Sequence, residues 1–425
     1  MLPGRDMPRT VVSQDLYLFS LSYRCRRSFC RGFHVRTTTT RRYGLGTAVF
    51  LCCMVPIGKT GAFPAAADRI VYQKEAGQIC AVSGQTGTVI AQDADASTVI
   101  QKAIDSLPVT GGKVYIAAGT YELTATICIE DKHGVHLEGA ARGIVFSQGR
   151  EGTVLRSQQA IDLIEVFGNK LKIAGITISS LHLIGSGKQN GKAGIVVRGR
   201  SDLLSLHQVG ANHCGIGFYL KGAVVDAPQI QFCDPQVNGI GLKIESSRYA
   251  KIVGGEFSDC DEYGILISAL TDGHTRTQGV KISSVTAVRN GKAGILIGKN
   301  TDCITVTGGS DFGGTKRGSG VVVSDEGSGN RPRNVIISSV HSYNNHHAGI
   351  LVDKVDHVIV SGCICSAHEH AAVGNAGQRY GVYVKANSRD VVIHSNITYG
   401  NTEQGILDDT GQARMASNSD TPVTD

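Results

Sequence analysis

The stretch Ala293-Gly294-Ile295-Leu296-Ile297 places a small residue and a glycine before a run of branched aliphatic residues one β-strand long. A glycine followed by Ile or Val recurs at intervals of 21 to 32 residues from position 194 to position 405. A unit repeated at this period indicates a solenoid, because one unit cannot bury its own apolar face and must stack on its neighbours. The glycines are Gly194, Gly215, Gly239, Gly264, Gly294, Gly320, Gly349, Gly381 and Gly405.

Each repeat contains short strand-like runs. Between Gly264 and Gly294 there are three β-branched runs, which begin at Ile265, Val280 and Val285 and are bounded by Gly, Ser, Asn or Asp. Such runs are typical of strands and not of helices. With about three strands per repeat and no helical return, the pattern predicts a parallel β-helix of about ten to twelve coils with a single core.

An amphipathic helix is predicted just before the repeats. Apolar residues keep i, i+3, i+4, i+7 spacing from Ile100 to Leu107, and Pro108 ends the run. Thr98 and Gln101 predict a capping box at its start. Because the end of a β-helix leaves strand edges open, we expect this helix to be the N-terminal cap.

The first 67 residues do not follow the repeat pattern. Arg41 and Arg42 precede a modest apolar run, and Ala65 to Ala67 offers the small residues that a signal peptidase requires. We expect residues 1–67 to be an export leader with a disordered extension, read by the general secretory or twin-arginine route, which implies a secreted or periplasmic protein. Residues 68–92 are then an N-terminal segment, 93–410 the β-helix and 411–425 a disordered tail.

Charge and cysteine content limit the partners. The whole chain has a formal charge of +6, but the leader holds ten of the 42 basic and two of the 36 acidic residues, so the rest is near neutral at 32 basic to 34 acidic. This balance argues against a nucleic-acid partner. No apolar run is long enough to span a bilayer, so stable membrane insertion is not expected. The eight cysteines beyond the leader are expected to be mostly reduced and buried.

The segment Gly111-Gly112-Lys113-Val114-Tyr115-Ile116-Ala117-Ala118-Gly119-Thr120-Tyr121, together with the helix before it, resembles the start of the β-helix in the pectate-lyase-like superfamily. There a helix is followed by Gly-Gly-x-Val-x-Ile-Pro-x-Gly-x-Tyr, and Ala117 stands here in place of the usual Pro. The resemblance covers residues 93–410. It implies an all-β protein, a single-stranded right-handed parallel β-helix with an N-terminal capping helix.

The same superfamily contains lyases, hydrolases, epimerases, phage tailspikes and adhesins, so the fold does not decide the chemistry. The motifs that would decide are incomplete. There is no Trp for the Trp-Ile-Asp-His of pectate lyases. Asn300-Thr301-Asp302 resembles the polygalacturonase motif but lacks its Gly-His-Gly and Arg-Ile-Lys partners. Asp234-Pro235-Gln236 has Gln where mannuronan epimerases have the His of Asp-Pro-His.

Outward-facing positions supply the candidate binding residues. The fourth residue after each repeated glycine is expected to point outward and to stack in one column, with neighbours about 4.8 Å apart. This column is polar or small throughout, and the second residue after each glycine also faces outward. We expect glycan binding by Arg198, Tyr219, Lys243 and Asp353 from the column of fourth residues, and by Tyr383 from the column of second residues.

Histidines gather near the end of the repeats, where long inserts interrupt the coils. Six lie between residues 341 and 370, and imidazoles titrate near neutral pH, which suits acid-base catalysis. We expect the catalytic residues among this group and the cations beside it. Asp353 and Lys385 occupy matching positions and are expected to stack, and Asp353 with Asp325 is a weak candidate for Ca²⁺ binding. The catalytic candidates are His346, His368, His370, Arg379 and Lys385.

Two function classes follow from these residues. The favoured one is an exported enzyme on polysaccharide, preferably a lyase that acts on a uronate-containing glycan. Hydrolysis would need two carboxylates at a set separation, for which Asp353 with Glu369 or Asp325 is available, and an epimerase on the same scaffold stays open. The other class is a non-catalytic β-helix that binds glycan or serves as a surface or tailspike-like component. The expected partner is a polysaccharide, and a homo-oligomer is left open.

Overall fold

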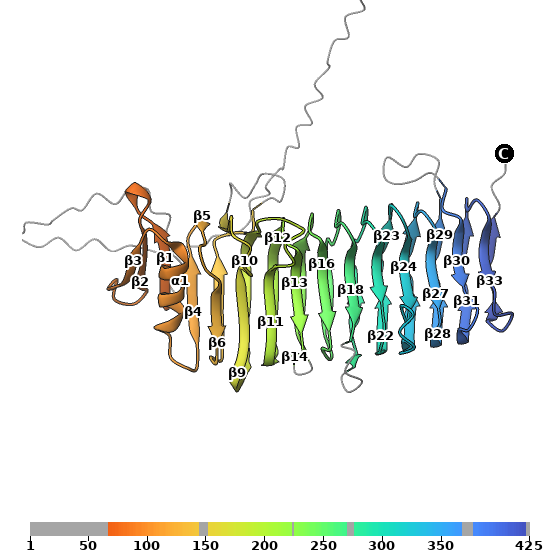
Figure 1. Cartoon of the computed structure of the whole chain (residues 1–425), viewed down its shortest axis with the longest axis horizontal. Helices are drawn as coiled ribbons and strands as arrows, with labels where there is room; N and C mark the ends of the chain where they lie inside the picture. Colours follow the sequence, from red (N-terminus) through yellow and green to blue (C-terminus); the bar gives the residue numbers. More distant parts are fainter. Residues whose placement is uncertain (1–66, 144–151, 223–224, 270–275, 368–376, 422–425) are drawn as a thin grey trace, which may run out of the picture. The chain divides into compact units, whose positions relative to one another are not determined.

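The computed structural model describes residues 67–143, 152–222, 225–269, 276–367 and 377–421. The predicted leader therefore lies, except for Ala67, outside the described residues. Within them the chain winds through successive parallel strands that stack coil upon coil (Figure 1).

The first wall of the solenoid is a parallel sheet with eleven strands along one path (Figure 1). This number agrees with the ten to twelve coils that the repeats predict. In chain order the strands are β6 (Ile127–Glu130), β9 (Ile164–Ala174), β11 (Ala193–Asp202), β13 (Ile216–Lys221), β16 (Ile240–Glu245), β18 (Tyr263–Ser268), β21 (Ala293–Ile297), β24 (Ser319–Ser324), β27 (Ala348–Asp353), β30 (Tyr380–Val384) and β33 (Gln404–Asp408).

The second wall is built in the same way and runs from the capping end to the last coil. Successive pairings in this wall are parallel. Its strands are β4 (Gly112–Ile116), β7 (Val135–Gly139), β10 (Thr177–Ile184), β12 (Ser205–Asn212), β15 (Gln229–Pro235), β17 (Lys251–Gly255), β20 (Lys281–Ser283), β22 (Thr301–Thr307), β25 (Arg333–Ser338), β28 (Asp356–Ser361), β31 (Arg389–His394) and β34 (Arg414–Ala416).

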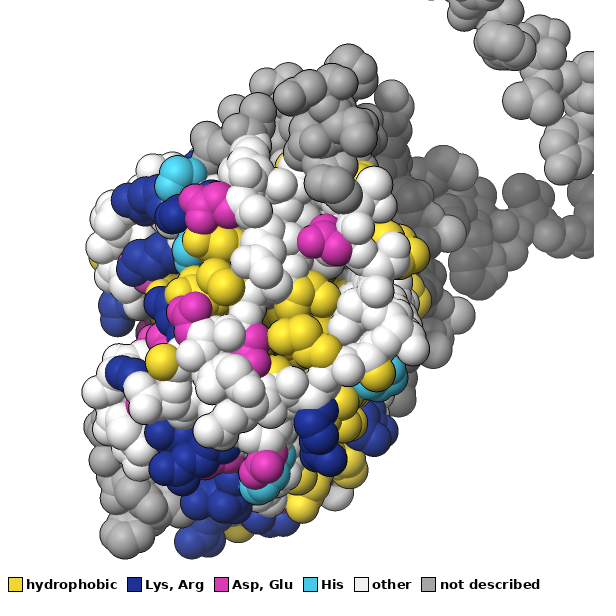
Figure 2. Space-filling model, turned by 90° about the vertical axis from the view of Figure 1, so that its right-hand side faces the viewer, with side chains coloured by type: hydrophobic (Ala, Val, Ile, Leu, Met, Phe, Trp, Pro, Cys, Tyr) yellow, Lys and Arg dark blue, Asp and Glu magenta, His cyan; other side chains and the backbone are white. Residues whose placement is uncertain are grey.

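A short third wall closes the later coils. It comprises β23 (Asp311–Gly313), β26 (His341–Tyr343), β29 (Ile364–Ser366), β32 (Ile397–Tyr399) and β35 (Ser419–Thr421). Because β34 pairs with β31 and β35 with β32, residues 411–421 continue the solenoid, and the prediction that the disordered tail begins at residue 411 is wrong. Figure 2, which faces this end, shows apolar side chains in the middle of the end face with a few Asp and Glu side chains among them, and Lys and Arg side chains toward its edge.

The start of the solenoid is covered by other elements. The strands β1 (Arg69–Gln73), β2 (Ile79–Ser83) and β3 (Val89–Asp93) form an antiparallel meander that joins the second wall through β1 and β4. The helix α1 (Ala96–Asp105) packs beside it (Figure 1). The remaining short elements are η1 (Glu75–Gly77), β5 (Gly119–Glu122), β8 (Thr153–Arg156), β14 (Val225–Asp226) and β19 (Thr277–Gln278).

The predicted capping box of α1 is wrong. Asp95 is the N-cap, and its carboxylate accepts from the backbone N–H groups of Ser97 and Thr98 at 3.2 and 3.0 Å. Gln101 instead reaches the first wall, where its side chain accepts from the N–H of Cys128 at 2.8 Å and donates to its C=O at 3.0 Å. The helix is thereby tied to β6 by two hydrogen bonds that a propensity argument does not reveal.

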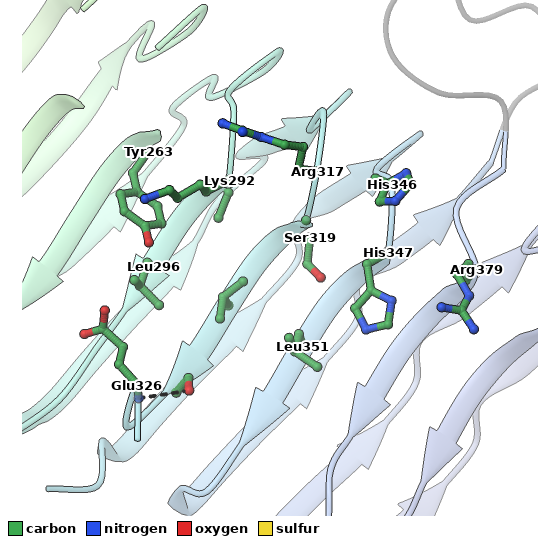
Figure 3. A pocket seen from close by; sticks show the side chains of 14 residues that line it. Tyr263, Lys292, Leu296, Arg317, Ser319, Glu326, His346, His347, Leu351 and Arg379 are labelled. Carbon is green, nitrogen blue, oxygen red and sulfur yellow. Dashed lines mark hydrogen bonds between the residues drawn. The ribbon is translucent and has the colours of Figure 1, made fainter. Parts of the chain in front are cut away.

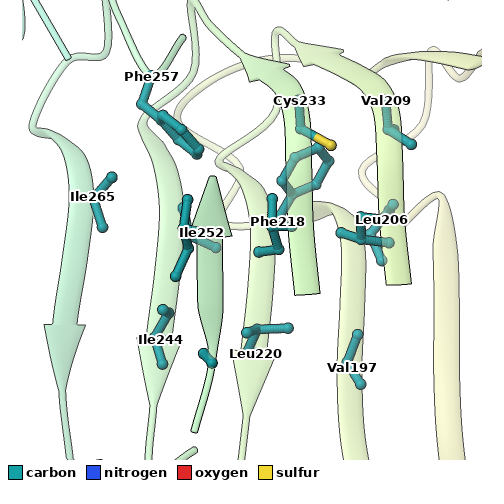
Figure 4. Packing of buried hydrophobic residues seen from close by; sticks show 14 of the residues in the cluster. Val197, Leu206, Val209, Phe218, Leu220, Cys233, Ile244, Ile252, Phe257 and Ile265 are labelled. Carbon is teal, nitrogen blue, oxygen red and sulfur yellow. The ribbon is translucent and has the colours of Figure 1, made fainter. Parts of the chain in front are cut away.

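The core is one continuous apolar column (Figure 4). Along the first wall, inward residues of successive coils are register partners and fully buried, for example Ile195, Phe218 and Leu242. Stacking like residues in this way buries each side chain against the next coil. The eight cysteines that the structure describes are free, and six of them are buried, as the sequence predicts.

The register corrects two of the repeats. Ile195 pairs with Phe218 and Phe218 with Leu242, so the residues that match Gly194 are Gly217 and Gly241, two positions after the glycines that the sequence pattern selects. Tyr219 and Lys243 therefore belong to the column of second residues, beside Val196 and Leu266, and the prediction that they share a column with Arg198 is wrong.

The glycine column has a steric cause. A Cβ added to Gly264 would lie 2.7 Å from the carbonyl oxygen of Gly294 and 2.8 Å from the side-chain nitrogen of Asn290. Asn290 is fully buried; its carboxamide accepts from the N–H of Cys260 at 3.0 Å and donates to the C=O of Phe257 at 3.0 Å. The glycines thus leave room for buried carboxamides that satisfy the backbone of the turns.

Candidate functional site

The outer face of the first wall is hollowed over β18, β21, β24 and β27 into a depression of about 420 Å³, which we call the groove (Figure 3). Its floor is apolar, because Leu296, Val322 and Leu351 are successive register partners on the outward face. The residues that line it are Tyr263, Lys292, Ala293, Leu296, Arg317, Gly318, Ser319, Val322, Ser324, Glu326, His346, His347, Leu351 and Arg379.

One wall of the groove is basic. It is made by the turns that lead into the strands, which place Lys292 before β21, Arg317 before β24, His346 and His347 before β27, and Arg379 before β30 (Figure 3). His346 and Arg379 were predicted from the sequence. Lys292 and Arg317 were missed, and His347 was not among the catalytic candidates. From Gly264 onward, the sequence carries a charged or imidazole side chain two or three residues before each column glycine, and this signal could have found them.

The cations of this wall differ in their partners. Nζ of Lys292 lies 2.8 Å from Glu262, and Nε of Arg379 lies 2.6 Å from Glu403. Within the described parts of the chain, Arg317 has no ion pair, and its side chain is exposed. An unpaired guanidinium at the rim of a groove is suited to bind a carboxylate in a bidentate manner.

His347 is the half-buried imidazole of the groove. Its ring meets the rings of Tyr380 and Tyr383 edge-on, with centroids 5.5 and 5.7 Å apart. Burial lowers the pKa of His347, and the nearby positive charges of Arg379 and Lys385 lower it further. The imidazole is therefore neutral at neutral pH and available as a base.

Asp353 and Lys385 lie beside the groove. Val352 and Val384 are register partners, so Asp353 and Lys385 follow them at matching positions on adjacent coils, as the sequence predicts. Lys385 Nζ is 3.9 Å from Asp353 Oδ2. The hydroxyl of Tyr383 donates to Asp409 at 2.6 Å, and this bond raises the pKa of the phenol to about 12. His368 and His370 fall in the segment 368–376, outside the described residues.

The other predicted binding residues lie toward the N-terminal end of the same face. Lys243 Nζ is 4.8 Å from the centre of the Tyr219 ring and 3.3 Å from Glu245. Lys243, Leu266 and Leu296 are successive register partners, so this cluster begins two strands before the groove floor. Arg198 is further away, pairs with Glu165 and lies 4.1 Å above the Phe167 ring.

The two residues predicted to bind Ca²⁺, Asp325 and Asp353, each have other partners. Asp325 is buried and accepts from the N–H groups of Gly327 and Gly329 at 2.8 and 3.2 Å, and Asp353 faces Lys385. No group of three or more His, Cys, Asp or Glu residues is placed to hold a metal ion in the described ranges. Ca²⁺ binding by Asp325 and Asp353 stays a prediction.

Comparison with known proteins identifies the fold. A family model of the right-handed β-helix region matches residues 163–334 and 274–420. The A-module of the mannuronan C-5 epimerase AlgE4 from Azotobacter vinelandii superposes with a TM-score of 0.58 at 15% identity, over 78% of this chain and 94% of that one. No curated protein sequence matches the chain.

Two further solved structures are similar in fold. The catalytic unit of the GH87 α-1,3-glucanase from Streptomyces thermodiastaticus gives a TM-score of 0.55 at 14% identity, over 78% of this chain and 67% of that one. The Dettilon tailspike protein gives 0.54 at 11% identity, over 82% and 68%. At such identities the likeness shows a shared fold and no more. A search of the described residues for a helix long and apolar enough to cross a membrane finds none.

Proposed function

Because this chain belongs to the right-handed β-helix family, we propose that it acts on a glycan held in the groove, and that it cleaves an acidic glycan by β-elimination with His347 as the base. The observation that carries the proposal is a neutral imidazole among cations. A base that removes a carbon-bound proton must be unprotonated, and the uronate carboxylate beside that carbon needs positive charge around it.

Residues of the basic wall can supply each group that β-elimination requires. His347 takes the C5 proton of a uronate, the electron pair of the C–H bond forms the C4–C5 double bond, and the C4–O4 bond breaks. The leaving oxygen takes a proton from His346 or from water. Arg317 binds the carboxylate and stabilises the negative charge that develops on it as the proton leaves.

The groove favours elimination over hydrolysis. Retaining and inverting hydrolases use a pair of carboxylates across the scissile bond. Glu326 is the one acidic residue among the described side chains that line the groove. His368 and His370 stay proposed as acid or base, and Asp353, Lys385 and Tyr383 as groups that contact the sugar beside the groove. Export of the protein also stays a proposal.

The test is to incubate the folded chain with uronate polymers and to follow unsaturated ends by absorbance, reducing sugar and uronate configuration in parallel. We expect unsaturated ends to form, and His347→Gln to slow their formation by about 10² or more. His357→Gln is the matched control, because His357 is exposed on the second wall and pairs with Asp390 at 3.4 Å.

The other outcomes separate the alternatives. A change of configuration without cleavage would indicate an epimerase, and reducing sugar without unsaturated ends would indicate a hydrolase. Binding without turnover would indicate a non-catalytic glycan-binding β-helix. Each of these results contradicts the lyase proposal.

A further inference from the structure

The basic wall of the groove is part of a longer row of side chains that runs along the solenoid axis, with one position per coil. Backbone N–H to C=O bonds of 2.7 to 3.0 Å join Lys292 to Glu262, His347 to Gly318, Arg379 to His347 and Glu403 to Arg379. Arg317 adjoins Gly318. Neighbouring positions are therefore about 4.8 Å apart, one strand spacing.

The charges in this row follow an order. Glu262 precedes β18 at one end, Glu403 precedes β33 at the other, and Lys292, Arg317 and Arg379 lie between them. Each terminal carboxylate pairs with the cation next to it, at 2.8 Å for Glu262 and 2.6 Å for Glu403. Three cations and two carboxylates leave one net positive charge, and it lies at Arg317.

The floor of the groove likewise offers no site for additional carboxylates of a ligand. Leu296, Val322 and Leu351 offer an apolar surface of three coils, which suits the C–H faces of sugars and not their carboxylates. Glu326 lines the groove opposite the basic wall, and its negative charge contributes to the raised pKa of Tyr263. A second carboxylate of the ligand would find no unpaired cation in the described part of the groove.

We propose that the groove selects a sparsely charged acidic glycan, with one uronate among neutral sugars, over a homopolymer of uronates. A sugar unit in an extended chain advances by a length close to one strand spacing. A homopolyuronate laid along the row would therefore bring carboxylates against Glu262 and Glu403 as well as Arg317, and like charges oppose binding. A glycan with a single carboxylate bound at Arg317 places no negative charge against Glu262 or Glu403. This inference rests on the proposed function of the groove.

The test compares two probes by titration calorimetry at fixed ionic strength. One is an oligosaccharide of polymannuronate; the other is an oligosaccharide of deacylated gellan, whose repeat holds a single glucuronate among neutral sugars. Wild-type protein is expected to bind the gellan probe more tightly. The double variant Glu262→Gln/Glu403→Gln should bind polymannuronate about tenfold more tightly than wild type and gellan within about twofold of it.

Glu122→Gln is the matched control. Glu122 forms an exposed ion pair with Arg156 on β5 and β8, away from the groove, so this variant should bind both probes as wild type does. Preference of wild type for polymannuronate, or a double variant with an unchanged ratio of affinities, would overturn the selectivity. If Arg317→Ala binds both probes as wild type does, or if wild type binds neither, the proposed function itself fails.

Discussion

The imidazole of His347 meets the ring of Tyr383 edge-on, with centroids 5.7 Å apart and the ring planes at 78°. His347 precedes β27 and Tyr383 lies on β30, so the contact joins adjacent coils. The aromatic ring shields the imidazole from water and thereby favours its neutral form. The protonation of the proposed base is thus set by residues of the next coil.

The first prediction concerns this shielding. Tyr383→Ala should raise the pKa of His347 toward its ordinary value of about 6.5, because water would then reach the imidazole. Tyr383→Phe keeps the ring and should leave the pKa close to that of wild type. The measurement is an NMR titration of the imidazole. If the pKa of His347 in Tyr383→Ala equals that in wild type, the ring contact does not control this pKa.

The second prediction concerns the charges around the same base. Positive charge at Arg379 is one cause of the lowered pKa of His347, while Glu403 acts in the opposite direction. Arg379→Gln removes the cation and leaves the negative charge of Glu403 without its ion-pair partner, so the pKa of His347 should rise. The acidic limb of the pH–rate profile should therefore shift to higher pH. Arg198→Gln, several strands away, should leave the limb in place.

The third prediction concerns the buried carboxamides. Asn290→Ala leaves the N–H of Cys260 and the C=O of Phe257 without their side-chain partner inside the solenoid. We expect the free energy of unfolding to fall by about 2 to 4 kcal/mol. Urea denaturation measures it, with Asn330→Ala as the control, because Asn330 is exposed. A loss no larger than that of the control would mean that these turns do not depend on the carboxamide.

The fourth prediction concerns pH and stability. Burial lowers the pKa of His182, a fully buried residue of β10, to about 4. The imidazole is protonated near pH 6.5 in the unfolded chain and only near pH 4 in the folded chain. Above pH 6.5 it is neutral in both states and has no effect on the pH dependence of stability. As the pH falls from 6.5 toward 4, the unfolded chain binds the proton and the free energy of unfolding decreases. Its slope is at most about 1.4 kcal/mol per pH unit in that window.

His182→Gln should flatten the stability curve between these two pH values, whatever its effect on stability at neutral pH. His357→Gln should keep the slope, because His357 is exposed on the second wall. Denaturant titrations at a series of pH values supply the comparison. An unchanged slope in His182→Gln would refute the assignment.

Local sequence determined the repeating part of this protein. A glycine before a β-branched run recurs in each coil, and this short-range signal suffices to predict the coils. The apolar spacing from Ile100 to Leu107 occurs once and suffices to predict α1. Where two glycines compete, as at Gly215 and Gly217, the local pattern is ambiguous. The ladder decides between them, because Phe218 and not Ile216 pairs with Ile195 and fills the core.

The groove was decided by the tertiary structure. Lys292, Arg317, His347 and Arg379 are about thirty residues apart in sequence, and they form one wall because each coil hydrogen-bonds to the next in a fixed register. The sequence showed which of these residues carry charge. Which cations are neutralised by Glu262 and Glu403, and which one is left for a ligand, depends on distances between coils that only the stacked chain defines.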